Sequence, residues 1–183
     1  MTNVVIYYTL SGEPSASLLV RAASLCTNRP PEQISIRRES GKKPVFLSPF
    51  PLYASVSHSG GVWAAAFSDV LPVGLDLQKT VSVRRMDGIL TRYFHPAERE
   101  AVLAASPEAR DAAFCRMWSR KEAAAKLSGR GIDGGFSSFD ASASPTDVFG
   151  ETLFIRDFAL PGFPELAAAA VFPAEFEITL IPF

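Results

Sequence analysis

The chain has 183 residues, of which 48% are hydrophobic and 20% are charged, a composition typical of a globular protein with one fair-sized core or two small lobes that share one. Its formal net charge of −1 argues against bulk attraction to nucleic acid or to an anionic membrane. Neither a stretch of about 20 apolar residues nor a basic, signal-like start is present, so we expect a cytoplasmic protein without a membrane span.

The first part of the chain has mostly strand-like patterns around one helix. Runs rich in β-branched and aromatic residues predict strands, and these runs cover residues 4–8, 34–38, 53–57, 62–68 and 73–78. Apolar residues at helical spacing predict a helix over 14–26. The Gly- and Pro-rich stretch 41–51 is expected to be a loop, and Gly60-Gly61 is expected to form a hairpin turn.

The second part is helical first and strand-like afterwards. Helical spacing recurs over 83–93, 96–105 and 107–127, and the last of these helices ends at a loop that contains Gly129, Gly131, Gly134 and Gly135. Strands are expected at 152–158, 166–172 and 176–181. This order indicates an α+β fold with antiparallel sheets and packed helices. Cys26 and Cys115 lack metal-ligand spacing and are expected to be buried thiols in helices.

The strand at 73–78 carries two oxygen-bearing side chains on one face. Side chains alternate across a strand, so Asp76 and Gln78 share the face opposite Leu75 and Leu77. Carboxylate and amide oxygens are ligands that suit Mg²⁺. For this strand taken alone, a solvated face of an edge strand is the alternative interpretation.

The long helix carries charged residues next to apolar ones. At 100° per residue, Glu122 and Lys126 lie together at the edge of an apolar arc, beside Trp118. An i,i+4 pair of this kind is usually solvent-exposed and contributes about 0.3–0.5 kcal/mol. Lys121 falls inside the apolar arc, which indicates either a snorkelling side chain or a pocket that holds an anion.

The predicted hairpin contains Ser57-His58-Ser59-Gly60. A lone histidine is more often structural than catalytic. No Asp–His–Ser arrangement and no nucleophile-elbow glycines accompany these serines, which argues against a serine hydrolase. The sequence also contains no P-loop and no dinucleotide-binding fingerprint.

Together these segments resemble the surfactin-synthetase-activating type of 4'-phosphopantetheinyl transferase. The matching motifs, in the order of the family, are SVSHSGG (Ser55–Gly61), VGLDLQKT (Val73–Thr80), FHPAE (Phe94–Glu98) and WSRKEAAAKLSGRG (Trp118–Gly131), with GKKP (Gly41–Pro44) as a looser match. The resemblance covers residues 14–172. Each motif alone is weak, whereas the helix motif placed after the hairpin and the G-x-D strand is a specific combination.

The resemblance implies two similar α+β lobes related by pseudo-twofold symmetry, 1–80 and 81–183, with the active site between them. It implies an enzyme that transfers the 4'-phosphopantetheine arm of coenzyme A to a serine of an apo acyl- or peptidyl-carrier protein and releases 3',5'-ADP. The carrier would belong to fatty-acid, polyketide or nonribosomal-peptide biosynthesis. A monomer is expected, with neither nucleic acid nor a membrane as partner.

The resemblance also implies roles for individual residues. Asp76 and Glu122 match the metal-binding carboxylates, and Lys126 matches the lysine beside the transferred phosphate. These three are the expected catalytic residues, with Glu122 as the base for the carrier serine, directly or through a metal-bound water. Mg²⁺ is the expected ion, and Mn²⁺ is the alternative.

Further matches concern the coenzyme. The residues that match coenzyme contacts are Ser57, His58, Thr80 and a lysine of the GKKP segment, Lys42 or Lys43. Glu98 matches a further acid of the family. The basic residues that bind the 3'-phosphate in larger members have no clear counterparts, and the available candidates are Arg21, Arg37, Arg38, Lys42 and Lys43.

The chain departs from the family pattern at Gln78, where a glutamate is frequent. An amide oxygen is a neutral ligand, so we expect weaker metal binding rather than none. A degenerate relative that binds coenzyme A or a carrier without transfer is the second hypothesis. An unrelated α+β protein with chance motifs is the third, and a structure with Asp76 and Glu122 far apart would favour it.

Overall fold

The structure, a computed structural model, describes residues 2–37, 39, 42–47, 51–132 and 135–183. Arg38, Gly41 and Gly134, which belong to the segments predicted above, lie outside these residues. Within the described part, the predicted α+β class with packed helices is confirmed. None of the helices in these ranges combines the length and the apolar character that a bilayer crossing needs.

The α-helices and strands follow the predicted order, with two additional short strands. Their bounds are β1 (Thr2–Leu10), α1 (Ser15–Thr27), β2 (Ile36–Arg37), β3 (Val45–Phe46), β4 (Tyr53–Ser59), β5 (Val62–Ser68), β6 (Gly74–Lys79), α2 (Met86–Tyr93), α3 (Pro96–Leu103), α4 (Arg110–Ser128), β7 (Thr146–Val148), β8 (Glu151–Phe158), β9 (Leu166–Phe172) and β10 (Phe176–Pro182). The short strands β3 and β7 were not predicted, and β3 lies within the segment expected to be a loop. Helix α2 begins at Met86 rather than at 83, because Arg85 has a left-handed backbone with φ of 56°.

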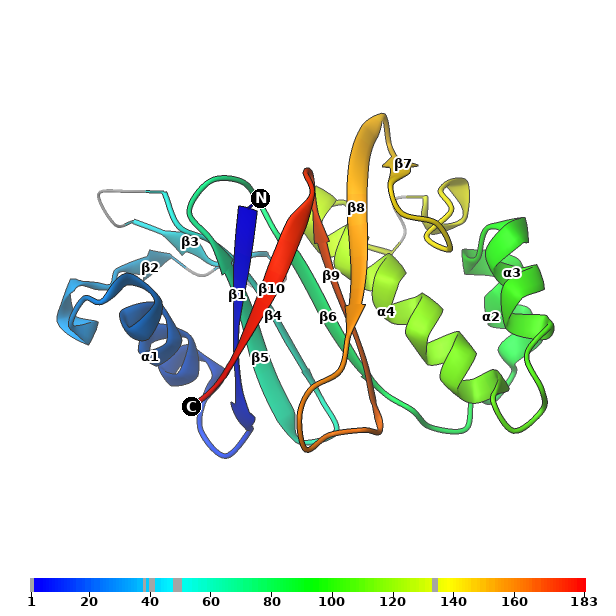
Figure 1. Cartoon of the computed structure of the whole chain (residues 1–183), viewed down its shortest axis with the longest axis horizontal. Helices are drawn as coiled ribbons and strands as arrows, with labels where there is room; N and C mark the ends of the chain where they lie inside the picture. The colour runs from blue at the N-terminus through cyan, green and yellow to red at the C-terminus, as the bar shows by residue number, and fades with distance from the viewer. Residues whose placement is uncertain (1, 38, 40–41, 48–50, 133–134) are drawn as a thin grey trace.

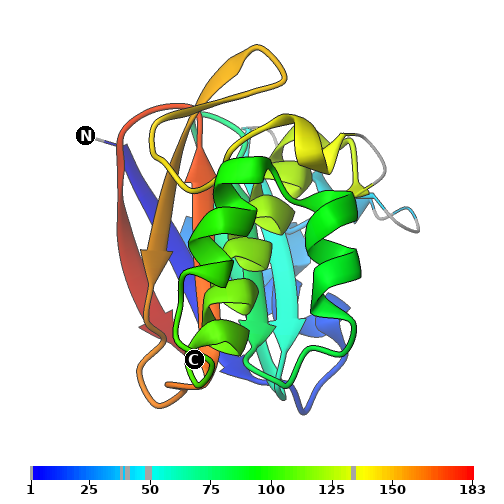
Figure 2. The same ribbon diagram turned by 90° about the vertical axis from the view of Figure 1, so that its right-hand side faces the viewer.

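In the described residues, two four-stranded sheets form the middle of the molecule, with strand orders β10-β1-β5-β4 and β6-β9-β8-β7 (Figure 1). Helix α1 covers the outer face of the first sheet, and α4 covers the outer face of the second. Figure 2 shows α2 and α3 beside α4 at this second face. Strand β10 pairs with β1 in parallel, so the first sheet contains strands from both sides of residue 80. The lobe boundary and the pseudo-twofold relation stay predictions.

Strand β5 of the first sheet is buried on both of its faces. Its residues Val62, Ala64 and Ala66 belong to the core between the sheets. The intervening Trp63, Ala65 and Phe67 pack against α1. Because each face meets an apolar layer, the strand lacks the polar alternation of a surface strand.

Serine side chains join the two sheets along β4 and β6. The serines at alternate positions of β4 are Ser55, Ser57 and Ser59, and we call them the serine seam. Their hydroxyl oxygens accept hydrogen bonds from the backbone N–H groups of Leu75, Leu77 and Lys79 at 3.0, 3.1 and 2.9 Å, respectively. The hydroxyls thus take the place of the carbonyls that a backbone ladder would supply. The seam therefore fixes β6, and Asp76 with it, against the hairpin.

Helix α4 crosses β6 very closely at Gly74. A Cβ atom at this position would lie 2.9 Å from the carbonyl carbon of Ala123 and closer still to its oxygen. Because both contacts involve helix backbone, neither can rotate away. The glycine of the G-x-D pattern therefore allows the approach that brings Asp76 of β6 next to the C-terminal half of α4.

We expect Gly74→Ala to lower the free energy of unfolding by at least about 1–3 kcal/mol, because α4 must move away from β6. Urea unfolding monitored by circular dichroism measures this change. Gly88→Ala is the matched control, since Gly88 lies within α2 and its added methyl group meets open space. That control should gain about 0.5–1 kcal/mol from helix propensity. Equal stability of Gly74→Ala and the natural protein would contradict the close crossing.

Candidate active site

A small cavity adjoins a larger one where β4, β6 and the C-terminal half of α4 meet. The small cavity has a volume of about 260 Å³ and is lined by Asp76 and Gln78. The larger cavity has a volume of about 930 Å³. The residues that line both are Val56, His58, Glu122 and Lys126. The proposed metal, phosphate and coenzyme residues from β4, β6 and α4 thus meet in one continuous space.

Asp76 is the centre of a hydrogen-bond network in the small cavity. Asp76 is only 3% exposed to solvent. Lys126 Nζ lies 2.7 Å from Oδ1, and the Ser57 hydroxyl donates to the same oxygen at 2.9 Å. The side-chain amide of Gln78 donates to Oδ2 at 2.9 Å. Ser119 donates to the backbone carbonyl of Asp76 at 3.0 Å. These contacts hold the carboxylate in one orientation.

The Ser57 hydroxyl is fully used in this network. It donates to Asp76 and accepts from the backbone N–H of Leu77 at 3.1 Å and from Lys126 Nζ at 3.1 Å. A hydroxyl has one proton to donate and two lone pairs to accept with. Ser57 therefore links the serine seam, Asp76 and α4, which is a positioning function.

Glu122 is the second carboxylate of the small cavity. Burial raises the pKa of its carboxyl group, and the negative charge of Asp76 raises it further, whereas Lys126 lowers it. Among the described residues, no group of three His, Cys, Asp or Glu side chains is placed to hold a metal ion. Asp76 and Glu122 do fit a divalent cation, because its charge would relieve the repulsion between the two carboxylates.

Lys42 and Lys43 line the larger cavity, whereas Thr80 does not lie there. The Lys43 ammonium donates to the carbonyl of Val73 at 2.8 Å. Burial, and secondarily the charge of Lys126, lowers the pKa of Lys43 to about 8. Such an accumulation of positive charge suits a phosphate ligand. Thr80 lines a separate cavity of about 420 Å³, so its role as a coenzyme contact stays a prediction.

The described arginines that were candidates for the 3'-phosphate are engaged elsewhere. Arg21 forms an ion pair with Glu13 at 2.8 Å, and Arg37 lies 3.8 Å from Glu39. Sequence reasoning did not single out Arg130, which lines the larger cavity. The sequence feature that could have indicated Arg130 is a basic residue between two glycines directly after the active-site helix.

Sequence reasoning also missed the joining function of the serine seam and the support that Ser119 gives to Asp76. The signal for the seam was a serine at every second position of 55–59, which places all three hydroxyls on one face of a strand. The signal for Ser119 was a polar residue next to Trp118 inside the long helix, where serine is a poor helix former.

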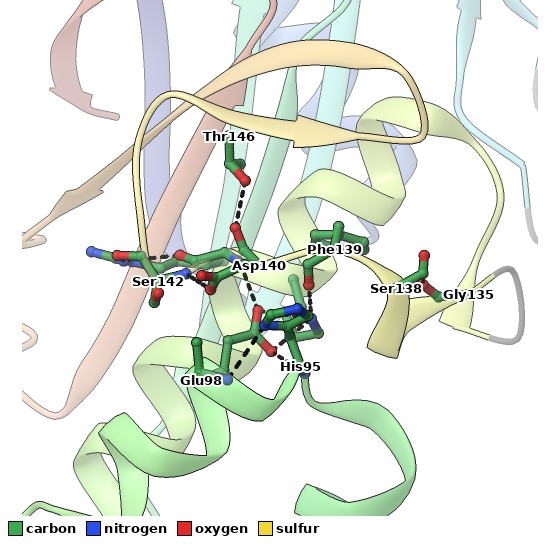
Figure 3. A network of polar contacts seen from close by, with 12 residues as sticks. His95, Glu98, Gly135, Ser138, Phe139, Asp140, Ser142 and Thr146 are labelled. Carbon is green, nitrogen blue, oxygen red and sulfur yellow. Dashed lines mark hydrogen bonds and ion pairs between the residues drawn. The ribbon is translucent and has the colours of Figure 1, made fainter.

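Lys121 and Glu98 form a fully buried ion pair beside the site. Lys121 Nζ lies 2.8 Å from the Glu98 carboxylate, and both side chains are 0% exposed. Lys121 also donates to the carbonyl of Phe139 at 3.1 Å. Glu98 accepts from the backbone N–H groups of His95 and Ala141 (Figure 3). The side chain of Lys121 does not snorkel, because it is fully buried, and its anion is the protein's own Glu98 rather than a ligand in a pocket.

Comparisons with known proteins identify the family of the chain. A family model described as the 4'-phosphopantetheinyl transferase superfamily matches residues 72–170. The 4'-phosphopantetheinyl transferase psf-1 of Bacillus pumilus is 37% identical over 63% of this chain and 48% of its own length. AcpT of Salmonella typhimurium is 31% identical over 70% of this chain and 67% of its own length. A 4'-phosphopantetheinyl transferase of Bacillus subtilis is 30% identical over 67% of this chain and 54% of its own length.

The matched stretch thus spans about half the length of the Bacillus relatives and two thirds of the Salmonella one. The range that the family model matches contains Asp76, Glu98, Glu122 and Lys126. The match of the family model to residues 72–170 shows that the motifs did not arise by chance in an unrelated fold, and the structure places Asp76 and Glu122 in one cavity rather than far apart. The chain belongs to the 4'-phosphopantetheinyl transferase superfamily.

Proposed function

We propose that the protein transfers the 4'-phosphopantetheine arm of coenzyme A to a serine of an apo acyl- or peptidyl-carrier protein and releases 3',5'-ADP. The observation that supports this most is that Asp76, Glu122 and Lys126 line one cavity, which adjoins a larger, lysine-lined one. Carboxylates for a divalent cation and ammonium groups for phosphates are what transfer from a diphosphate needs.

Asp76 and Glu122, with the side-chain oxygen of Gln78, would hold Mg²⁺ or, alternatively, Mn²⁺. The ion would neutralise charge on the diphosphate of the coenzyme. Following the family resemblance, we further propose a monomer of two lobes, 1–80 and 81–183, that acts in the cytoplasm and has neither nucleic acid nor a membrane as partner.

The remaining chemistry falls to the side chains. The hydroxyl oxygen of the carrier serine bonds to the β-phosphorus of coenzyme A, and the bond from that phosphorus to the bridging oxygen breaks. Glu122 takes the serine proton as the general base. The ammonium group of Lys126 donates hydrogen bonds to the departing phosphate of 3',5'-ADP.

The test is to mix the protein with coenzyme A, Mg²⁺ and a broad panel of apo carrier proteins, and to weigh each carrier by mass spectrometry. A carrier that gains the mass of one phosphopantetheine supports the proposal. If no carrier in the panel gains it, transfer is overturned. Tight coenzyme binding in the same sample would then favour the non-catalytic relative, for which Gln78 is the motivating feature.

We expect Gln78→Glu to lower the Mg²⁺ concentration for half-maximal transfer by at least about tenfold, because a third carboxylate beside the ion should strengthen its binding by at least about 1.4 kcal/mol. Without Mg²⁺ the variant should melt at a lower temperature, since its new carboxylate replaces the amide that donates to Asp76. Gln33→Glu, which adds the same charge at an exposed position, is the control. An unchanged Mg²⁺ titration would show that Gln78 makes only a structural hydrogen bond.

A further inference from the structure

Arg130 lies at the larger cavity in a defined arrangement. Helix α4 ends at Gly129, whose φ of 71° turns the chain, and Arg130 follows directly. The guanidinium carbon of Arg130 lies 4.4 Å from the centre of the Phe149 ring. A guanidinium that stacks on an aromatic face keeps its N–H groups at the edge available for donation. The stacking therefore favours an orientation in which Arg130 binds an anion in the cavity that it lines.

Phe149 is held in place despite an unfavourable backbone. It sits at the tip of the β7–β8 hairpin with φ of 57°, in the left-handed region that bulky residues rarely occupy. Its ring packs edge-to-face on Phe139, with ring centres 5.4 Å apart. It also lies 3.3 Å from where a Cβ of Gly135 would be. Such strain is retained where the surrounding structure or a function demands it, and here it places the ring under Arg130.

The cations of the site fall into two groups. Lys126 lines both cavities and pairs with Asp76 at the proposed metal end. Lys42, Lys43 and Arg130 line the larger cavity and not the small one that contains Asp76. Of these, Lys42 is already paired with Glu39 at 2.6 Å. Among the described lining residues of the larger cavity, Glu122 is the single acid. This second group of cations therefore suits an anion distinct from the diphosphate.

Coenzyme A carries such a second anion, the phosphomonoester on its ribose. We propose that Arg130, oriented by Phe149, binds this 3'-phosphate and gives the protein a preference for coenzyme A over dephospho-coenzyme A. This inference rests on the proposed function, because that function makes coenzyme A the ligand. A guanidinium matches a phosphate with two parallel hydrogen bonds, whereas the ammonium of Lys43 already donates to the carbonyl of Val73.

The test measures binding of coenzyme A and of dephospho-coenzyme A by calorimetry, with the 183-residue chain, Mg²⁺ and no carrier. The natural protein should bind coenzyme A about ten- to a hundredfold more tightly, as expected for a charge-assisted pair of hydrogen bonds. Arg130→Gln should weaken binding of coenzyme A by this factor and leave dephospho-coenzyme A unchanged. Phe149→Leu, which removes the aromatic face, should reduce the preference in part.

Arg156→Gln is the matched control, because Arg156 also stacks on a phenylalanine, Phe176, but lies outside both cavities. It should retain the full preference. Equal affinity of the natural protein for both ligands overturns the inference, and so does an equal loss for both ligands in Arg130→Gln. Since no carrier is present, these outcomes are independent of transfer. If the protein modifies a carrier but its preference for coenzyme A over dephospho-coenzyme A does not depend on Arg130, only this inference is overturned. If the protein binds neither ligand, the proposed function is overturned as well.

Discussion

Replacement of Asp76 by asparagine, or of Glu122 by glutamine, should lower the rate of transfer by at least about a thousandfold, which corresponds to about 4 kcal/mol of transition-state stabilisation. Each change removes one of the two carboxylates that line the small cavity. Without that charge the proposed divalent ion would bind weakly, and the charge that develops on the diphosphate would be poorly neutralised. In Glu122→Gln the proposed acceptor for the serine proton is lost as well. Alanine at either position should have the same effect.

The fold should survive both changes. Asparagine at position 76 retains the oxygen that accepts from Ser57, and Lys126, which loses its counter-charge, still donates to Ser57 and is 30% exposed at its side chain. Thermal unfolding checks this point, and single-turnover mass spectrometry at saturating Mg²⁺ measures the rate. Glu177→Gln, at an exposed position of β10, is the control and should transfer normally. Turnover comparable to that of the control would remove the altered residue from the mechanism.

Lys121→Met should lower the free energy of unfolding by about 3–5 kcal/mol, because it leaves the Glu98 carboxylate buried without its counter-charge. Burial already raises the pKa of Glu98 and lowers the pKa of Lys121, so each charge depends on the other. Urea unfolding measures the loss. The exposed pair of Glu13 and Arg21 provides the control, since Glu13→Gln should cost less than about 1 kcal/mol.

A double-mutant cycle tests the same pair without depending on either single variant. Glu98→Gln combined with Lys121→Met should cost clearly less than the sum of the two single changes, because no unpaired charge remains. Strict additivity would mean that the two groups do not interact. The pair connects α3, α4 and the segment around Phe139, so its loss should also reduce transfer by displacing α4, which carries Glu122 and Lys126.

Local periodicity was sufficient to predict the faces of single elements. The alternation along β6 correctly paired Asp76 with Gln78, and the helical period correctly placed Lys121 on the buried side of α4. It did not pair Lys121 with Glu98, because the two are 23 residues apart and no local pattern relates them. That Asp76 would meet α4 was expected from the family resemblance alone.

The rest of the fold depends on contacts that are distant in sequence. The parallel pairing of β10 with β1 joins the two ends of the described chain and leaves no signal in either strand. Strands β3 and β7 have too few residues for alternation to be recognised. Gly74 packs directly against the backbone of Ala123. A glycine in the sequence indicates that something approaches the strand closely, but it does not indicate which element.

The serine seam has a consequence for the dynamics of the protein. The amide protons of Leu75, Leu77 and Lys79 are bonded to side-chain hydroxyls of the opposite sheet rather than to a backbone ladder. They exchange with solvent when the two sheets part, and this opening requires neither sheet to unfold. Amide hydrogen exchange at these three positions therefore reports how often the junction beneath the cavity opens. A coenzyme that contacts both β4 and α4 should slow this exchange selectively, before any carrier protein arrives.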